Sequence, residues 1–189
     1  LNGSYTEVVG GSFSQAIYSL YGYYSTTKKV SELQTAEKIA KIKPFDRLLK
    51  YQKQGAIMGA AIHPQYLKDT TEEELTNKGL ITIHSYLILK LKQFGGKNFL
   101  CLRNPWGDHE WLGDWSDTSE LWTEELKEAL GMEEAEDGIF WMIADDFFYY
   151  FTSIDIAKPI PDDYHVRRFS VILKPGPHDG YKAEMKEAD

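Results

Sequence analysis

The side chains best suited to chemistry in this sequence are its single cysteine and some of its five histidines. Cys101 stands between two leucines in the middle of a predicted strand, and apolar surroundings raise the pKa of a thiol and suppress its reactivity. We therefore interpret Cys101 as a core residue and not as a nucleophile. His109 lies beside Asp108 and Glu110, but no second histidine or cysteine stands at the spacing that a transition-metal site needs. The surroundings of His84 are more informative.

His84 lies in the segment 81–91, where nearly every odd position is apolar and the even positions are more polar. This alternation predicts a half-buried strand with His84 on its more polar face. The pair Gly95-Gly96 separates it from a second predicted strand, residues 98–104, so the two form a predicted β-hairpin. A hairpin centred one residue before the glycine pair places His84 directly opposite Asn104. A shift of register by one residue would separate these two side chains.

Sequence signals on either side of the hairpin predict both helices and strands. Helices are expected where a capping residue or an N-terminal proline precedes apolar residues at helical spacing, and strands where short apolar runs stand between turn residues. The expected helices are residues 15–21 capped by Ser12, residues 44–55, a short helix from residue 72, residues 124–130 and a helix capped by Asp145. The further expected strands are residues 56–62, 139–144, 152–156 and 166–173.

The tryptophan-rich stretch that begins at Asn104 resembles the catalytic asparagine region of calpains. The matching residues are Arg103-Asn104-Pro105-Trp106-Gly107, then Glu110-Trp111, Gly113, Trp115-Ser116-Asp117 and Trp122. Supporting blocks, in the family's order, are Leu1-Asn2-Gly3-Ser4-Tyr5, Gly10-Gly11, Gly79-Leu80, His84-Ser85-Tyr86, Asp137-Gly138, Phe140-Trp141-Met142 and Asp146-Phe147. The resemblance implies that residues 1–157 form the second protease subdomain of a calpain. Residues 158–189 would then be a linker and the start of a following domain, or a disordered tail.

The resemblance to calpains also implies a fold and a mechanism. The fold is α+β, with antiparallel sheets packed against several helices, as in the β-rich half of papain-like cysteine proteases. His84 would be the acid and base, Asn104 would hold its ring, and Trp106 would shield that contact from water. The nucleophilic cysteine belongs to the N-terminal subdomain, which is the expected partner. The chain would therefore contribute to an intracellular endopeptidase that cleaves proteins, and would be inactive alone.

Two residues beside His84 depart from the family pattern. Calpains usually have glycine before this histidine and alanine after it, where the chain has Ile83 and Ser85. An alternative function is therefore a non-catalytic calpain-like scaffold, with cytoskeletal proteins among its candidate partners. A cysteine at the nucleophile position of the first subdomain would favour the enzyme, and serine or glycine there would favour the scaffold.

Calcium is the cofactor that the resemblance implies, and no organic cofactor is expected. The residues that match family ligands are Glu110, Asp117 and Asp137, together with the backbone carbonyl of Ala135. Ile139 stands where the family pattern supplies a further acidic ligand. Calcium prefers six to eight oxygen ligands, so the loss of one carboxylate predicts a weakened site. The alternative is that these acids are solvated loop charges in an acidic protein.

Composition excludes several other classes of function. The chain has 29 acidic and 21 basic residues, and no basic cluster lies beside exposed-looking aromatic residues, so nucleic acid is not an expected partner. No apolar run has the length of a membrane span. A single cysteine permits no internal disulfide, which favours a cytoplasmic location. The 42% hydrophobic and 14% aromatic content predicts a folded domain.

Overall fold

A computed structural model describes residues 11–40, 42–67, 69–160, 169–175 and 181–187. The chain divides into two compact units, Leu1–Pro159 and Ile160–Asp189. The assignment of residues 1–157 and 158–189 to a protease subdomain and a following segment stays a prediction. Within the described residues, no helix has the length and apolar character needed to cross a lipid bilayer.

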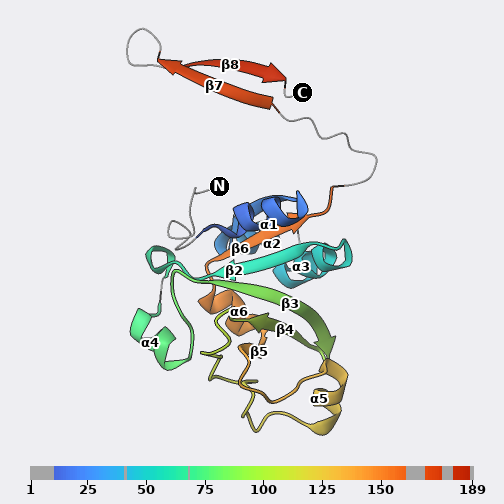
Figure 1. The fold of residues 1–189 in the computed structure, drawn as a ribbon. Helices are drawn as coiled ribbons and strands as arrows, with labels where there is room; N and C mark the ends of the chain where they lie inside the picture. Colours follow the sequence, from blue (N-terminus) through green and yellow to red (C-terminus); the bar gives the residue numbers. More distant parts are fainter. Residues whose placement is uncertain (1–10, 41, 68, 161–168, 176–180, 188–189) are drawn as a thin grey trace. The chain divides into compact units, whose positions relative to one another are not determined.

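One six-stranded antiparallel sheet forms the centre of the first unit (Figure 1). Its order is β1-β6-β2-β3-β4-β5. The strands are β1 (Tyr24–Lys29), β2 (Ile57–Ala61), β3 (Ser85–Phe94), β4 (Lys97–Arg103), β5 (Ile139–Ile143) and β6 (Ser153–Lys158). The second unit contains an antiparallel pair, β7 (Phe169–Pro175) and β8 (Tyr181–Glu187). Of the expected strand 166–173, residues 166–168 lie outside the described residues. The helices and antiparallel strands together confirm the predicted α+β fold.

Helices of the first unit begin and end largely where local chemistry predicts. They are α1 (Phe13–Tyr21), α2 (Val30–Ala40), α3 (Pro44–Lys53), the short 3₁₀ helix η2 (Pro64–Tyr66), α4 (Glu72–Asn77), α5 (Glu124–Leu130) and α6 (Ala144–Tyr150). Ser12 caps α1 by accepting a hydrogen bond from the Gln15 N–H, and Gly22 ends it in the left-handed conformation. Thr71 and Glu74 form a complete capping box on α4.

Asp145 does not cap α6, so that prediction was wrong. The capping position is occupied by Ile143, which makes no side-chain capping bond, and Asp145 lies in the first turn. The reason is that β5 runs into α6 without an intervening loop, leaving no room for a separate polar cap. Asp145 and Asp146 still place negative charge at the positive end of the helix dipole.

The sequence analysis missed β1 and α2, which follow one another directly. β1 is an edge strand that pairs only with β6 among the described residues, and nearly all its side chains are exposed. A strand without a buried face shows no alternation of apolar and polar residues, so its sequence carries no period-two signal. α2 buries only Val30 and Leu33 among its described side chains, which is also too few to mark a helical period.

The β3–β4 hairpin exists, but the predicted register was wrong. Its turn is closed by the pair Phe94 and Lys97, and the two residues between them, Gly95 and Gly96, both have positive φ. A two-residue turn of this kind fits the right-handed twist of the flanking strands, and glycine adopts it without steric cost. The hairpin is therefore centred between the glycines and not on Phe94.

The predicted start of the first strand at residue 81 was also wrong. β3 begins at Ser85, and its last ladder pair at this end is Leu87 with Arg103. The ladder shifts by one residue at a bulge between Ile88 and Lys90. His84 therefore lies outside the sheet and is not a ladder partner of Asn104.

Strand β4 lies between two separate hydrophobic clusters. Alternate side chains of a strand point to opposite faces of the sheet, and here both faces are covered. One cluster takes Leu100 and Leu102 of β4 together with Phe140 and Met142 of β5. The other takes Phe99 and Cys101 of β4 with Trp141 of β5, and packs them against Trp115, Trp122 and α5. Figure 1 shows α5 beside the turn of the β3–β4 hairpin.

Lys92 of β3 holds the end of α5 in this second cluster. Its Nζ donates to the carbonyls of Ala129 and Leu130 at 2.8 and 3.1 Å, in the last turn of the helix. We expect Lys92→Met to lower the free energy of unfolding by about 1.5–3 kcal/mol, the usual contribution of charge-assisted hydrogen bonds. Urea unfolding followed by tryptophan fluorescence measures this loss. Lys97→Met, at an exposed position, is the control, and equal losses in both variants would contradict the prediction.

Candidate active site

His84 and Asn104 are in direct contact although the strand ladder does not pair them. The Nε2 atom of His84 lies 2.7 Å from Oδ1 of Asn104. His84 stands one residue before β3 and Asn104 one residue after β4, so both emerge from the same open end of the hairpin. The predicted contact between His84 and Asn104 is present although the predicted register was wrong. The two residues meet beyond the last ladder pair, where neither belongs to a strand.

The side-chain amide of Asn104 has a single orientation fixed by backbone groups. Its residue is fully buried, at 0% exposed, and its Oδ1 also accepts a hydrogen bond from the Trp106 N–H at 3.1 Å. Its Nδ2 donates to the backbone carbonyls of Asp108 and His109. Backbone N–H and C=O groups cannot exchange roles, so the amide oxygen must be the atom that faces His84.

The orientation of Asn104 in turn assigns the tautomer of His84. Because the amide presents only an acceptor, the Nε2 atom of the imidazole must carry the proton and donate it to Oδ1. In the neutral ring the second nitrogen, Nδ1, is then an unprotonated base. Within the described residues no group forms a hydrogen bond with Nδ1, so this base is available to an external proton donor.

A close backbone approach holds the main chain of Asn104. Its N–H donates to the carbonyl of Gly138 at 2.8 Å, and its own carbonyl accepts from the Gly107 N–H at 3.0 Å. Gly138 has a φ of 81°, and a Cβ atom there would lie 2.5 Å from the Asn104 carbonyl oxygen. Only glycine fits this position, which gives a physical reason for the Asp137-Gly138 block of the sequence.

Two aromatic rings contact the imidazole of His84. The Trp106 ring lies with its centroid 4.3 Å from that of His84, and the Tyr86 ring meets the imidazole edge-on at 5.0 Å. Trp106 is itself 63% exposed, so it covers one side of the imidazole while facing solvent on the other. The geometry is compatible with the expected shielding by Trp106, which stays a prediction.

Strained backbone conformations occur in the segments next to the His84–Asn104 pair. The described non-glycine residues with positive φ are Ile83, His109 and Trp115, and all three lie in the segments that lead into or follow the His84–Asn104 contact. Ile83, with a φ of 52°, is the most unfavourable because a β-branched side chain is rarely tolerated in the left-handed region. It is also 79% exposed, so packing does not compensate the strain. Strained conformations of this kind concentrate at functional sites.

The acidic loop residues that were expected to bind calcium lie close to one another but mainly bond to backbone groups. Glu110 Oε1 accepts from the N–H groups of Asp137 and Gly138 at 3.0 and 2.7 Å. Asp117 Oδ2 accepts from the Ala135 N–H at 3.2 Å. These bonds tie the loop after Asn104 to the segment before β5.

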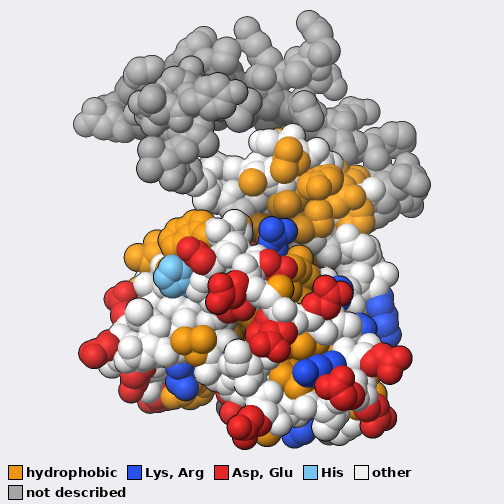
Figure 2. All heavy atoms as spheres, turned by 60° about the horizontal axis from the view of Figure 1, so that its bottom comes forward, with side chains coloured by type: hydrophobic (Ala, Val, Ile, Leu, Met, Phe, Trp, Pro, Cys, Tyr) orange, Lys and Arg blue, Asp and Glu red, His pale blue; other side chains and the backbone are white. Residues whose placement is uncertain are grey.

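One carboxylate oxygen in this region has no partner. Asp117 Oδ1 is buried and makes no hydrogen bond to any described residue. Burial raises the pKa of Asp117 to about 6; the Ala135 N–H lowers it, and the nearby charges of Glu110, Asp137 and Glu134 raise it further. An unpaired oxygen in a field of negative charge fits a cation. Figure 2 shows that acidic side chains are also denser than basic ones on the face of the molecule that it presents.

The fit to calcium is partial. Glu110, Asp117 and Ala135 border a hollow of about 330 Å³, with Glu134 also on its wall. Asp137 does not border it, and its Oδ1 accepts from the Ile139 N–H instead. Among the described residues no three histidine, cysteine or acidic side chains converge as metal ligands. The remaining oxygen ligands would therefore have to come from carbonyls and water.

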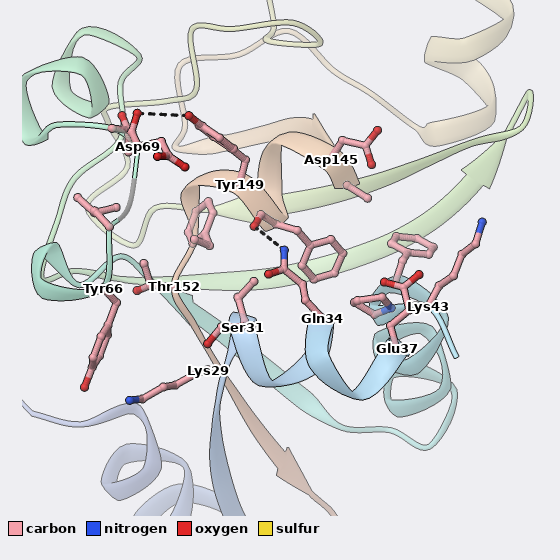
Figure 3. A pocket seen from close by; sticks show the side chains of 18 of the residues that line it. Lys29, Ser31, Gln34, Glu37, Lys43, Tyr66, Asp69, Asp145, Tyr149 and Thr152 are labelled. Carbon is pink, nitrogen blue, oxygen red and sulfur yellow. Dashed lines mark hydrogen bonds between the residues drawn. The ribbon is translucent and has the colours of Figure 1, made fainter. Parts of the chain in front are cut away.

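A larger cavity, of about 820 Å³, lies away from the histidine (Figure 3). Figure 3 shows Gln34 of α2 directed at α6, where its Nε2 donates to the carbonyl of Phe148. His84, Asn104 and Trp106 are not among the residues that line the cavity. Its wall includes Thr152, which bonds to the backbone of Ala61 and His63. The end of β2 therefore separates the cavity from the turn before His84. The sequence analysis missed it because α2, one of its walls, was not predicted.

Comparison with known proteins shows the family to which this chain belongs. A family profile described as "Calpain family cysteine protease" matches residues 1–158. The chain therefore belongs to the calpain family of cysteine proteases.

Individual relatives are similar over most of the chain. Calpain-9 of Mus musculus is 33% identical over 186 residues, covering 93% of this chain and 26% of that protein. The calpain-1 catalytic subunit of Bos taurus is 33% identical over 89% of this chain and 23% of its own length. Calpain-type cysteine protease ADL1 of Oryza sativa subsp. japonica is 30% identical over 90% of this chain and 8% of its own length. The chain thus spans between 8% and 26% of the length of these relatives.

The raised pKa of Asp117 predicts a pH-dependent stability. A folded-state pKa of about 6, above the ordinary 3.8, means that the native state holds this proton more tightly than the unfolded state does. The contribution of Asp117 to stability should therefore fall as the pH rises from about 4 through about 6. We expect Asp117→Asn to flatten this part of the profile and to melt higher than the unchanged chain near neutral pH, with calcium removed by a chelator.

Thermal melts across this pH range check the prediction. Asp46→Asn, which removes an exposed carboxylate from the first turn of α3, is the control and should leave the shape of the profile unchanged. Parallel profiles for the unchanged chain and Asp117→Asn would show that this carboxyl does not titrate as described.

Proposed function

We propose that this chain is the second protease subdomain of a calpain-type endopeptidase and contributes His84 and Asn104 to an active site that it shares with an N-terminal subdomain. The observation that carries the proposal is the fixed amide of Asn104, which leaves His84 Nδ1 as a free base. Nε2 of His84 is held by a buried asparagine, whereas Nδ1 has no hydrogen-bond partner among the described residues, which is the arrangement that a general base needs.

The chemistry follows from the two ring nitrogens. Nδ1 of His84 takes the proton of a thiol from the partner subdomain, and the resulting thiolate attacks the carbonyl carbon of a peptide bond. The positive imidazole keeps its Nε2–H directed at Oδ1 of Asn104, so the ring keeps its orientation while it carries the second proton. The same Nδ1 proton then passes to the leaving amine as the carbon–nitrogen bond breaks. Water completes the cycle by hydrolysing the thioester.

Cys101 does not supply the thiol in this proposal. It is 1% exposed and packs in the cluster with Phe99 and Trp141, away from the cluster that contains Tyr86. Burial raises the pKa of Cys101 to about 12, so its reactive thiolate form is scarce near neutral pH. The nucleophile must therefore come from outside this chain, and the chain alone should be inactive.

Reconstitution tests the proposed function. The chain alone should not hydrolyse a fluorogenic peptide, and activity should appear when it is joined to the cysteine-bearing subdomain of its parent protein. In that assembly His84→Ala should lower kcat by about 10²- to 10⁴-fold, the usual contribution of general acid and base catalysis. Asn104→Ala should lower it by about 100-fold, because the ring loses its orientation.

Cys101→Ala serves as the control and should keep most of the activity. Hydrolysis by the chain alone, or an assembly that tolerates His84→Ala, would refute the proposed function.

A second candidate function, a calpain-like scaffold without proteolytic activity, is favoured by one observation. Ile83 places a strained and exposed branched side chain beside the candidate base, where the family pattern has glycine. In that case the fold would serve to bind proteins, including cytoskeletal ones, in the cytoplasm. Serine or glycine at the nucleophile position of the parent protein would support the scaffold, and cysteine would support the enzyme.

We also propose that calcium binds weakly beside the candidate active site. Asp117, Glu110 and the carbonyl of Ala135 would hold it, and the ion would neutralise the buried Asp117 carboxylate. The bonds from Glu110 to the Asp137–Gly138 backbone connect this region to the Gly138 carbonyl that binds Asn104. A cation here would therefore stabilise the loops on both sides of the asparagine.

Calcium should stabilise the isolated chain. Millimolar calcium is expected to raise the melting temperature of the first unit by about 2–5 °C near neutral pH, since a ligand that binds only the folded state stabilises it. The shift should vanish in Asp117→Ala and should be smaller with magnesium, which tolerates irregular sites poorly. Differential scanning fluorimetry measures both. An equal shift in the variant would place any bound calcium elsewhere.

A further inference from the structure

The turn that delivers His84 to Asn104 lies outside the sheet. The Thr82 hydroxyl donates a hydrogen bond to Glu72 Oε2 at 2.9 Å, and two backbone N–H groups of the turn also donate hydrogen bonds. The N–H of Ile83 donates to the carbonyl of Ile62 at 2.8 Å. The N–H of Ile81 donates to the side-chain hydroxyl of Tyr86 at 2.8 Å. The acceptors of the two backbone N–H groups are therefore the carbonyl of Ile62, just after β2, and the hydroxyl of Tyr86, two residues after the histidine.

This turn needs to be held because it is strained. Ile83 adopts the left-handed conformation and its side chain is mostly solvent-exposed, so neither propensity nor packing favours the observed backbone. A free turn of this sequence would relax to an extended conformation, and His84, the next residue, would rotate with it. The bonds made by Ile81, Thr82 and Ile83 are thus among the described interactions that oppose this relaxation.

The side chain of Tyr86 is fixed by packing, so its hydroxyl can hold the turn in place. Its side chain is fully buried and meets Phe140 and Phe151 edge-on, at centroid distances of 6.0 and 5.3 Å. Its ring also meets the imidazole of His84 edge-on at 5.0 Å. The Tyr86 side chain therefore contacts the imidazole of His84 and also accepts a hydrogen bond from Ile81, at the start of the turn that precedes the histidine.

We propose that Tyr86 is a positioning residue for His84, whose hydroxyl fixes the strained turn 81–83 so that the imidazole Nε2–H meets Asn104. The proposal rests on the proposed function for its consequence in catalysis, but the positioning itself is a property of this chain. A buried tyrosine needs a partner for its hydroxyl in any fold, so the distinguishing effect is on the histidine and not on stability alone.

The test is nitrogen NMR of the imidazole in the whole 189-residue chain and in Tyr86→Phe, which keeps the ring and removes only the hydroxyl. In the unchanged chain, neutral His84 should be the Nε2–H tautomer. In Tyr86→Phe the Nδ1–H tautomer should appear, and exchange of the Nε2 proton should become about five- to tenfold faster, the factor expected for one lost hydrogen bond. An unchanged tautomer and exchange rate would overturn the proposal.

Two further variants exclude a general loss of stability. Tyr150→Phe makes the same chemical change on a buried tyrosine that packs against Trp111, and it should leave the His84 signals unchanged. Ile83→Asn relieves the strain, because asparagine tolerates the left-handed region, so adding Tyr86→Phe to it should change Nε2 exchange less than about twofold. An equal effect of Tyr86→Phe with and without Ile83→Asn, or an effect of Tyr150→Phe, would assign Tyr86 a merely structural role.

The active assembly distinguishes failure of this inference from failure of the proposed function. Tyr86→Phe should lower kcat with little change in KM, because it misplaces the base without touching substrate. If His84→Ala leaves activity intact, the proposed function fails, whereas the tautomer measurement still decides whether Tyr86 positions the ring. If His84→Ala is inactive and Tyr86→Phe is fully active, the positioning role in catalysis is refuted.

Discussion

The fully hydrogen-bonded side-chain amide of Asn104 is the constraint on which the rest of the site depends. A flipped amide would turn its nitrogen toward the N–H groups of Trp106 and His84 and its oxygen toward two carbonyls. The contacts with Trp106, Asp108 and His109 would become repulsive whichever tautomer His84 adopts, in a buried position where unpaired polar groups are most costly. The side-chain amide of Asn104 therefore has one orientation, and this orientation determines the tautomer of the neutral His84 imidazole. The strained residues, the glycine at 138 and the loop after residue 104 all serve to deliver those four partners.

The sheet supplies the rigidity that such a small site needs. β4 ends one residue before Asn104 and is packed on both faces, by the cluster of Leu100 and Leu102 and by the cluster of Phe99 and Cys101. A strand fixed from both sides cannot twist without disturbing two cores. The histidine side of the arrangement lies in a turn outside the sheet.

Much of the fold could be predicted because local chemistry dictated it. Gly22, Thr71 and Gly131 mark helix boundaries that depend on capping groups close by in sequence. Elements without such signals were missed: β1 has no buried face, and its pairing with β6 is a contact between distant segments. The assignment of a cap to Asp145 failed because β5 runs directly into α6.

For the candidate site, the contact between His84 and Asn104 was predicted, but the geometry that produces it was not. The motif around Asn104 indicated which residues belong together, but no pattern revealed that β3 starts only after His84 or that Ile83 turns left-handed. The role of Tyr86 was equally hidden, since a strand tyrosine near a histidine is ordinarily a core residue. The acids at 110, 117 and 137 were found as a group, whereas the unpaired oxygen on Asp117 emerged only from three-dimensional burial.

The hairpin also determines when in folding the site can form. His84 and Asn104 are 20 residues apart in sequence. The Thr27–Asp155 hydrogen bond between β1 and β6 joins residues that are 128 positions apart. The entropy lost on closing a loop grows with its length, so the short hairpin can form without first joining the two ends of the unit. The His–Asn pair is thus built on the most local part of the sheet. Fraying of β1 at the opposite edge would leave it assembled, and a nascent chain would hold a complete base before its last strand had paired.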